Sequence, residues 1–174
     1  MKIDRIRQIA TKLGDKGSSK NYNNISFKKS DILFEVLGTI DELSSFLGLT
    51  YHYSNYENII VIQKHLQNIS AMIATDPKSE NYSKIMKVTM EDVAWIETEM
   101  QKLLNIKPLE PRFTLPGSEK SLIGAYFDFS RTIARKAERR LVEFSEKHSR
   151  TDLDSVISFT NRLSDFLYVL SYNM

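Results

Sequence analysis

The chain has 174 residues, enough for one domain with a sizeable apolar core, and we expect a single domain over residues 1–174. Its 24 Lys and Arg residues against 22 Asp and Glu give a net charge of +2, too small a bias to indicate a nucleic-acid partner or an anionic membrane. There is no Cys, and no apolar run is long enough for a membrane span or a signal peptide, so a cytoplasmic protein without disulfides or thiol chemistry is expected.

Residues 1–29 are polar and aperiodic, and they predict an extended N-terminal arm ahead of a helical domain over 30–174. From Ser30, interpreted as an N-cap, apolar residues recur at intervals of three and four and predict a helix to about residue 51. Gly38 and Gly48 inside this helix lower its intrinsic stability and indicate close packing by a neighbour.

The next two helices follow from the same periodicity. One is predicted over about 55–74 and ends before Pro77, because the residue that precedes a proline disfavours helical geometry. The other begins at Thr89 and Asp92, whose spacing is that of a capping box.

Two further helices complete the predicted fold. The first is long, from about 118 to 148, and the second begins at a Thr-x-x-Asp motif, Thr151 to Asp154, and extends almost to the C-terminus. No stretch alternates apolar and polar residues for long enough to favour a strand. The sequence therefore predicts an all-α protein, a bundle of about five helices with a loose arm.

A polar stripe marks the long fourth helix. Arg131, Arg135, Glu138 and Arg139 are offset by four, seven and eight positions, which places them on one helix face. Guanidinium groups there require an anionic partner, because an unpaired buried charge is unfavourable. The partner is either a bound anion or a structural carboxylate such as Asp41.

The arm contains the segment Thr11-Lys-Leu-Gly-Asp-Lys-Gly-Ser-Ser19. Its glycines allow the backbone to turn and present N–H groups to an anion, Lys16 adds a positive charge, and Asp15 offers a carboxylate to Mg²⁺. The same residues are also ordinary turn formers, so a plain turn is the alternative. The spacing is not that of a Walker A loop.

A second polar cluster, Asn161 to Asp165, interrupts the apolar pattern of the last helix and indicates either an interhelical hydrogen-bond cluster or a ligand contact. The three histidines do not follow a Glu by three positions, so the pattern of a di-metal bundle site is not met. A Ser-centred nucleophile motif is also absent.

Six segments in order resemble a known family: Thr11–Ser19, Leu37–Ser45, Ile73–Asp76, Phe113–Gly117, Ser130–Arg140 and Asn161–Leu167. They are similar to Thr-Arg-x-Gly-Asp-x-Gly-x-Thr, Tyr-Gly-Thr-Val-Asp-Glu-Leu-Asn-Ser, Leu-Ala-Thr-Pro, Phe-Ile-Leu-Pro-Gly, Ala-Arg-Thr-x-x-Arg-Arg-Ala-Glu-Arg-Arg and Asn-Arg-Leu-Ser-Asp-Tyr-Leu. Each is weak alone, but together they span nearly the whole chain and resemble the PduO-type ATP:cob(I)alamin adenosyltransferases.

The resemblance implies a five-helix up-and-down bundle, ferritin-like in architecture, which assembles as a homotrimer with ATP bound between subunits. It implies attack of the Co(I) of cob(I)alamin on the 5′-carbon of ATP, with Mg²⁺ present, to give adenosylcobalamin and triphosphate. A reductase and an adenosylcobalamin-dependent enzyme are the implied partners. The alternative is a module of the same fold that binds ATP or corrinoid with little turnover.

Matching positions imply the site residues. The arm residues that would wrap the Mg-triphosphate are Thr11, Gly14, Asp15, Lys16, Gly17, Ser18, Ser19 and Lys29. Arg135, Glu138 and Arg139 would meet the phosphates from their helix, with Asp15 and Glu138 as magnesium ligands. Asn161 would contact the nucleoside.

Other matched positions concern the corrin and the assembly. Phe113 matches the aromatic residue that occupies the lower face of the corrin, and with Arg135 it is the implied catalytic pair. Asp41 and Arg131 match an ion pair across the subunit boundary. Three departures stand out: Lys136 replaces an Arg, no Gly-Gly follows the arm, and the chain ends soon after its last helix, so any segment covering the corrin is expected to be very short.

Overall fold

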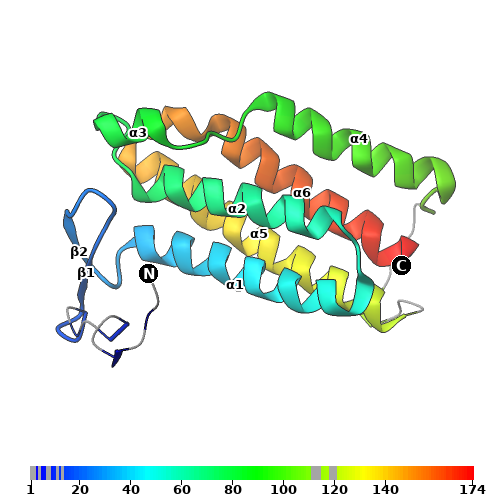
Figure 1. Cartoon of the computed structure of the whole chain (residues 1–174). Coiled ribbons are helices and arrows are strands. Elements are labelled where there is room, and N and C mark those ends of the chain that lie inside the picture. Colours follow the sequence, from blue (N-terminus) through cyan, green and yellow to red (C-terminus); the bar gives the residue numbers. More distant parts are fainter. Residues whose placement is uncertain are drawn as a thin grey trace.

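The structure is a computed structural model that describes residues 3, 5–6, 9–10, 12, 14–110, 115–117 and 121–174. Its described part contains five long helices: α1 Ile32–Ser54, α2 Asn58–Ala74, α4 Met90–Ile106, α5 Leu122–His148 and α6 Asp154–Asn173. Successive long helices run in opposite directions (Figure 1). The predicted all-α, five-helix up-and-down bundle is confirmed.

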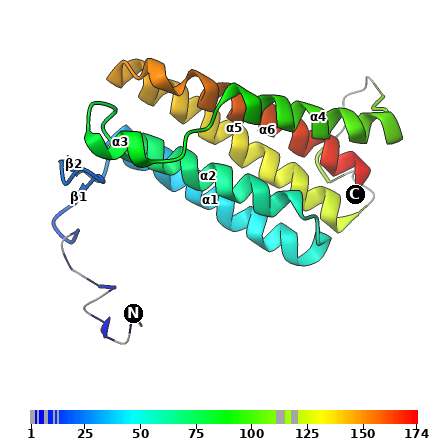
Figure 2. The ribbon, with the colours of Figure 1, turned by 45° about the horizontal axis from the view of Figure 1, so that its top comes forward.

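Helix α5 lies at the centre of the bundle. It packs against α1 on one side and α6 on the other, while α2 covers α1 and α4 covers α6 (Figures 1 and 2). Each long helix contributes a fully buried residue to one apolar core, for example Leu43, Leu66, Ile96, Phe127 and Phe159. Burial of such a side chain stabilises the fold by about 1.5–3 kcal/mol, so the apolar stripes hold the polar face of α5 in place.

Side-chain caps satisfy free backbone N–H groups at the starts of α4 and α5. The predicted capping box of α4 is confirmed, with the Thr89 N–H donating to Asp92 Oδ2 at 2.8 Å. Helix α5 begins at Leu122, where the Gly124 N–H donates to Ser121 Oγ at 2.9 Å.

Two predicted helix starts need correction. Asp31, and not Ser30, caps α1, because its Oδ1 accepts the Leu33 N–H at 3.0 Å. The last helix begins at Asp154, since the preceding residues Thr151–Leu153 form a turn of 3₁₀-helix, η2. A 3₁₀ turn at a helix entry follows the same sequence pattern as the helix itself, which explains the error.

The arm is more ordered than predicted. It contains an antiparallel hairpin of β1 Ser18–Lys20 and β2 Ser26–Lys28, so the expectation of no strand is wrong. Three-residue strands are too short to produce a visible alternation of apolar and polar residues. Phe27 of β2 packs against the bundle core and thereby attaches the hairpin to it.

Two smaller features also differ from expectation. A short helix, α3 Glu80–Lys84, follows α2 and was not predicted. Gly38 has open space where a side chain would stand, so close packing within the chain does not explain it, whereas a Cβ on Gly48 would lie 3.2 Å from the Gln63 amide nitrogen.

None of the helices in the described part combines the length and hydropathy needed to cross a membrane, and the cytoplasmic location stays a prediction.

Candidate functional site

The hairpin folds the arm back on itself and brings Lys29 to the glycines. A Cβ on Gly14 would lie 2.8 Å from Lys29 Nζ, so the ammonium group rests directly on the glycine backbone. Gly17 has φ +76°, a conformation that favours glycine, and its carbonyl accepts the Lys29 N–H at 2.9 Å. The predicted cluster of glycine backbone and lysine charge is therefore formed locally.

The other arm residues surround this cluster. Asp15 and Lys16 are exposed in the turn between the two glycines, and Ser18 and Ser19 begin β1 with partly buried side chains. Thr11, the first predicted residue of the arm site, lies outside the described residues. The arm thus offers backbone N–H groups, hydroxyls, a carboxylate and ammonium groups on one short stretch.

The polar face of α5 carries two exposed arginines, Arg135 and Arg139. The Arg135 side chain has no hydrogen bond or ion pair with any described residue. Arg139 donates from Nη1 to the Arg135 carbonyl at 3.1 Å, and this bond leaves its remaining N–H groups toward solvent. These two guanidinium groups are available to an anion from outside the chain.

Glu138 and Asn161 meet between α5 and α6. Asn161 Nδ2 donates to Glu138 Oε1 at 2.8 Å, and Asn161 Oδ1 accepts from Arg162 Nη1 at 2.8 Å. Arg162 Nε in turn donates to Glu97 of α4 at 2.7 Å. This network fixes the orientation of the Asn161 amide and leaves Glu138 Oε2 without a described partner, as a cation ligand would require. It also matches the alternative of an interhelical hydrogen-bond cluster.

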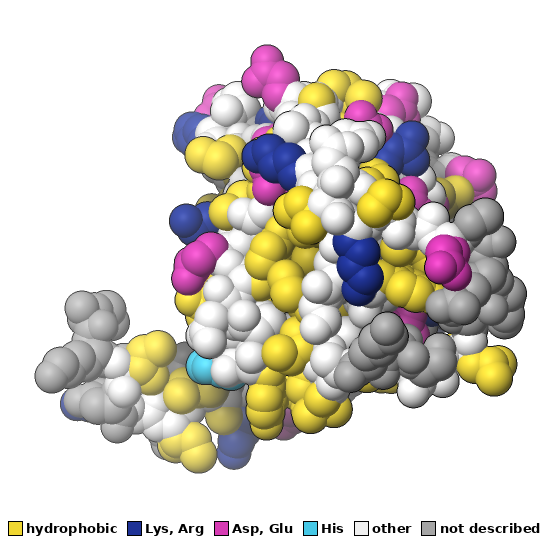
Figure 3. Space-filling view, turned by 90° about the vertical axis from the view of Figure 1, so that its right-hand side faces the viewer, with side chains coloured by type: hydrophobic (Ala, Val, Ile, Leu, Met, Phe, Trp, Pro, Cys, Tyr) yellow, Lys and Arg dark blue, Asp and Glu magenta, His cyan; other side chains and the backbone are white. Residues whose placement is uncertain are grey.

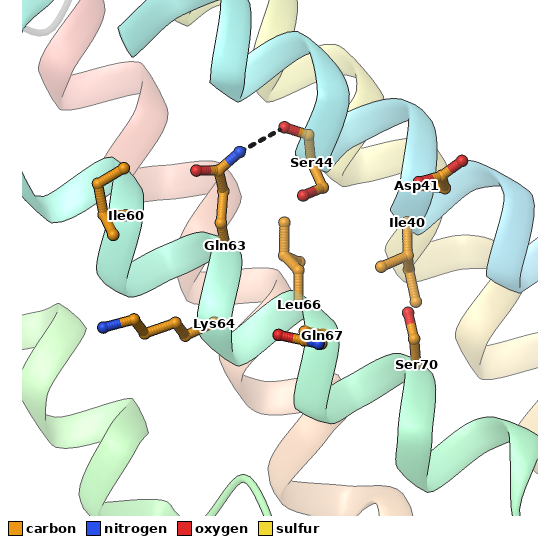
Figure 4. Close-up of a pocket in the computed structure, with 9 residues that line it drawn as sticks. All are labelled: Ile40, Asp41, Ser44, Ile60, Gln63, Lys64, Leu66, Gln67 and Ser70. Carbon is orange, nitrogen blue, oxygen red and sulfur yellow. Dashed lines mark hydrogen bonds between the residues drawn. The ribbon is translucent and has the colours of Figure 1, made fainter. Parts of the chain in front are cut away.

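Arg131 does not reach Asp41 within the chain. Arg131 Nε pairs instead with Asp128 Oδ1, one helical turn earlier, at 2.7 Å. Asp41, on α1, lines a groove of about 520 Å³ between α1 and α2 together with Ser44 and Gln63 (Figure 4). Arg131 therefore has a structural carboxylate as its partner, as the alternative to a bound anion expected, but that carboxylate is Asp128 and not Asp41.

Lys136 has a partner on a neighbouring helix. Its ammonium group pairs with the carboxylate of Glu42 across the contact between α1 and α5. Since residues 136 and 138 project about 200° apart around the helix, Lys136 points away from the face that carries Glu138. Lys136 is therefore paired with Glu42 and not with Glu138.

The connection that carries Phe113 begins after α4 and ends before α5, at the end of the bundle opposite the hairpin (Figure 1). Hydrophobic side chains gather on this end (Figure 3), where α1 and α4 end and α5 begins and where Tyr53, Ile106, Leu115 and Leu122 are exposed. Phe113 itself lies outside the described residues. The arm hairpin and the helix ends that flank this connection therefore lie at opposite ends of the bundle (Figure 1).

Two ionisable clusters outside this face hold the helices together. Arg150 donates to both carboxylate oxygens of Asp152 at 2.8 and 2.9 Å and to the Met72 carbonyl at 2.8 Å. Tyr82 donates to the same Asp152, and burial together with this bond raises the pKa of Tyr82 to about 12.

The second cluster surrounds His65, which was not singled out in the sequence. Its ring packs against Trp95 and Phe159 with centroid distances of 5.6 and 5.0 Å, and its Nδ1 lies 3.8 Å from Asp92. Burial lowers the pKa of His65, although Asp92 opposes this shift. In the described part of the chain no three His, Asp or Glu side chains are placed to hold a metal ion together.

The fold is an up-and-down helical bundle, and its glycine-bearing arm and exposed arginines are groups suited to binding an anionic ligand. The chain belongs to the cobalamin adenosyltransferase family, whose model matches residues 9–174. This confirms the family that the six sequence segments resemble.

Named relatives agree with this assignment. The chain is 34% identical over 178 residues to the corrinoid adenosyltransferase MMAB of Homo sapiens, with 98% of this chain and 70% of the relative covered. It is 31% identical to the corrinoid adenosyltransferase of Bacillus subtilis, with 92% and 83% covered. A variant PduO-type ATP:corrinoid adenosyltransferase from Lactobacillus reuteri, solved with cobalamin and ATP, has a TM-score of 0.85 at 27% identity, with 95% and 92% covered.

Proposed function

We propose that this protein transfers the 5′-deoxyadenosyl group of ATP to the cobalt of cob(I)alamin, giving adenosylcobalamin and triphosphate. The observation that carries the proposal is the family match over residues 9–174. In the reaction the Co(I) electron pair attacks the 5′-carbon, the bond from that carbon to the phosphate oxygen breaks, and its electron pair leaves with triphosphate. Because Co(I) is already a strong nucleophile, the protein needs no general base. It has to position two substrates and stabilise the departing charge.

The arm binds the triphosphate. Gly14 and Gly17 present backbone N–H groups, and Lys29, which rests on Gly14, supplies a charge beside them. The exposed Asp15 and Lys16 lie in the same turn. Thr11, Ser18 and Ser19 add hydroxyl groups to this set.

The helix face completes the site. Arg135 and Arg139 bind phosphate oxygens and neutralise charge on the triphosphate as it leaves. Glu138 keeps one carboxylate oxygen for Mg²⁺, and Asp15 is the second ligand. Two carboxylates suffice because Mg²⁺ bound with a nucleotide takes its other ligands from phosphate and water. Asn161, held by Glu138 and Arg162, contacts the nucleoside.

The functional unit is a homotrimer with ATP bound between subunits. Two observations support this assembly. Among the described residues no hydrogen bond or ion pair joins the arm to Arg135, Glu138 or Asn161. Asp41 and Arg131 face different surroundings within one chain, as an ion pair between two chains would require.

Phe113 is the residue assigned to the corrin. An aromatic side chain at the lower face of the corrin excludes the axial base, so that Co(II) becomes easier to reduce to Co(I). The exposed hydrophobic side chains at the end of the bundle where its connection starts and ends, among them Leu115 and Leu122, suit the apolar faces of a macrocycle.

The test is an anaerobic assay of the purified protein with Mg-ATP and chemically reduced cob(I)alamin. We expect the absorption spectrum of adenosylcobalamin to appear and one triphosphate to be released for each corrinoid consumed. The same mixture with unreduced cob(II)alamin is the control and should remain unchanged. No product from cob(I)alamin that stays reduced would refute the proposal, and ATP binding without product would leave the binding module as the function of this fold.

A further inference from the structure

The turn of the arm hairpin is built by asparagines. Asn21 Oδ1 accepts the N–H groups of Asn23 at 3.0 Å and of Ile25 at 2.9 Å, and the Asn21 N–H donates to the Ile25 carbonyl at 2.9 Å. Asn24 has φ +62°, in the left-handed region that Asn enters more readily than most other residues besides glycine. In this chain asparagines therefore form a tight turn within an arm that lacks the Gly-Gly pair.

Two hydrogen bonds attach this turn to the end of α2. The Tyr22 N–H donates to the Ala74 carbonyl at 3.1 Å, and the Asp76 N–H donates to Asn23 Oδ1 at 2.7 Å. A cavity of about 390 Å³ lies between the hairpin, the end of α2 and the end of α5. Because this space separates much of the hairpin turn from the helix ends, these two direct bonds hold the turn, while Phe27 attaches β2 to the core.

The bond from Asp76 depends on a second departure from the family pattern. The segment Ile73–Asp76 resembles Leu-Ala-Thr-Pro, so this chain has aspartate where that pattern has proline. Proline has no backbone N–H and would have nothing to donate to Asn23. This sequence therefore has both the acceptor, Asn23 Oδ1 on the hairpin turn, and the donor, the Asp76 N–H after α2.

The turn is directly connected to the glycine cluster. The three residues of β1 join Gly17 to Asn21, and β1 is paired with β2, which ends next to Lys29. A displacement of the turn is therefore transmitted to both sides of the cluster. We propose that Asn23, through the Asp76 N–H, is a positioning residue that holds the ATP-binding arm against the end of α2. This inference rests on the proposed function of the arm.

Loss of the anchor should weaken ATP binding more than turnover. A loosened arm has to be ordered by ATP itself, which lowers affinity, whereas the arm of the bound complex is the same. We expect Asn23→Ala and Asp76→Pro each to raise KM for ATP by about five-fold, the effect of one ordinary hydrogen bond, with kcat changed by less than about two-fold. The double variant should be no worse than either single one, because both remove the same bond.

Two matched variants serve as controls. Asp76→Asn keeps the backbone N–H and an oxygen that can accept from the Lys78 N–H, as Asp76 Oδ1 does, so its KM should equal that of the wild type. Asn105→Ala removes an exposed asparagine on α4 whose side chain accepts from Gln101 Nε2 at 2.8 Å, and it should also behave as the wild type. Circular dichroism and thermal melting establish that each variant is folded. If Asp76→Pro does not fold, the KM of Asn23→Ala alone tests the proposal.

The outcomes separate this inference from the proposed function. An unchanged KM in Asn23→Ala, a loss confined to kcat, or additive effects in the double variant would overturn the anchor. A wild type that makes no adenosylcobalamin refutes the proposed function instead, and ATP titration calorimetry then decides. Weaker binding by Asn23→Ala than by the wild type supports the anchor, while equal binding, or no binding by either protein, overturns it.

Discussion

Replacement of Arg150 by alanine should destabilise the fold by about 3 kcal/mol. The Arg150 side chain is 8% exposed and makes three hydrogen bonds, two to Asp152 and one to the Met72 carbonyl. Removal of one member of a buried ion pair costs about 3–5 kcal/mol, because the other charge is left unpaired. Asp152 is 28% exposed, so water solvates part of its charge, and the lower end of that range applies.

The assay is urea unfolding followed by circular dichroism, with thermal melting as a second measurement. For a chain of this size about 3 kcal/mol corresponds to a fall in Tm of roughly 6–12 °C. The matched control is Arg162→Ala, which removes a guanidinium that pairs with Glu97 at 2.7 Å but is 42% exposed, and which should cost no more than about 1 kcal/mol. Equal losses in the two variants would refute the reasoning that burial determines the contribution of the Arg150 pair.

The same pair has a definite pH dependence. Burial alone would raise the pKa of Asp152, but hydrogen bonds from Arg150 and Tyr82 outweigh burial and hold that pKa below its ordinary value of 3.8. A carboxyl whose pKa is lowered by folding stabilises the fold above its ordinary pKa and loses that contribution as the pH falls through the folded value. The stability difference between wild type and Arg150→Ala should therefore be constant near neutral pH and shrink once the pH falls below 3.8.

Three further predictions concern the site and the core. Arg135→Ala should lower kcat/KM by about 10²-fold or more with an unchanged helical spectrum, because it removes an exposed side chain that we propose stabilises the leaving triphosphate, and unchanged kinetics would count against this role. Asp41→Arg should reduce the mass measured by sedimentation, and addition of Arg131→Asp should restore the assembly if the two residues pair between chains. Burial lowers the pKa of His65, so stability should fall as the pH drops below 6.5, and His65→Phe should flatten that part of the profile in melts from about pH 7.5 to about pH 5.

The helices could be predicted from sequence because their signals are local. Apolar periodicity and the Thr89–Asp92 capping box involve residues within a few positions of one another. The hairpin could not, since two three-residue strands depend on pairing across a turn and leave no periodic trace. The start of α1 was misplaced by one residue because Ser30 and Asp31 are both good caps, and only the backbone geometry selects Asp31.

In the candidate site, likewise, some residues could be predicted from the sequence but their contacts could not. Residues such as Gly14, Glu138 and Asn161 could be chosen from motif matches, but the bond between Glu138 and Asn161 required the packing of α5 on α6. Tyr82 carried no signal because its partner Asp152 is 70 positions away in the sequence, and Arg150 carried none because its bond to the Met72 carbonyl spans 78 positions. Contacts of that range are set by the tertiary fold, which no local pattern encodes.

The two departures that bear on the site, at Lys136 and in the turn of the arm, have one physical explanation. Lys136 replaces an Arg and pairs with Glu42, on the side of α5 away from Glu138. The asparagine turn stands in an arm without Gly-Gly, and Asn23 gains a donor at Asp76. In each case the changed residue meets a partner within the chain, so the departure alters how the bundle and arm are held together and leaves the ligand-facing groups in place. We therefore expect a substitution at a family position to lower activity where it removes a group that we propose to bind substrate, as in the glycine cluster or on the face that carries Arg135.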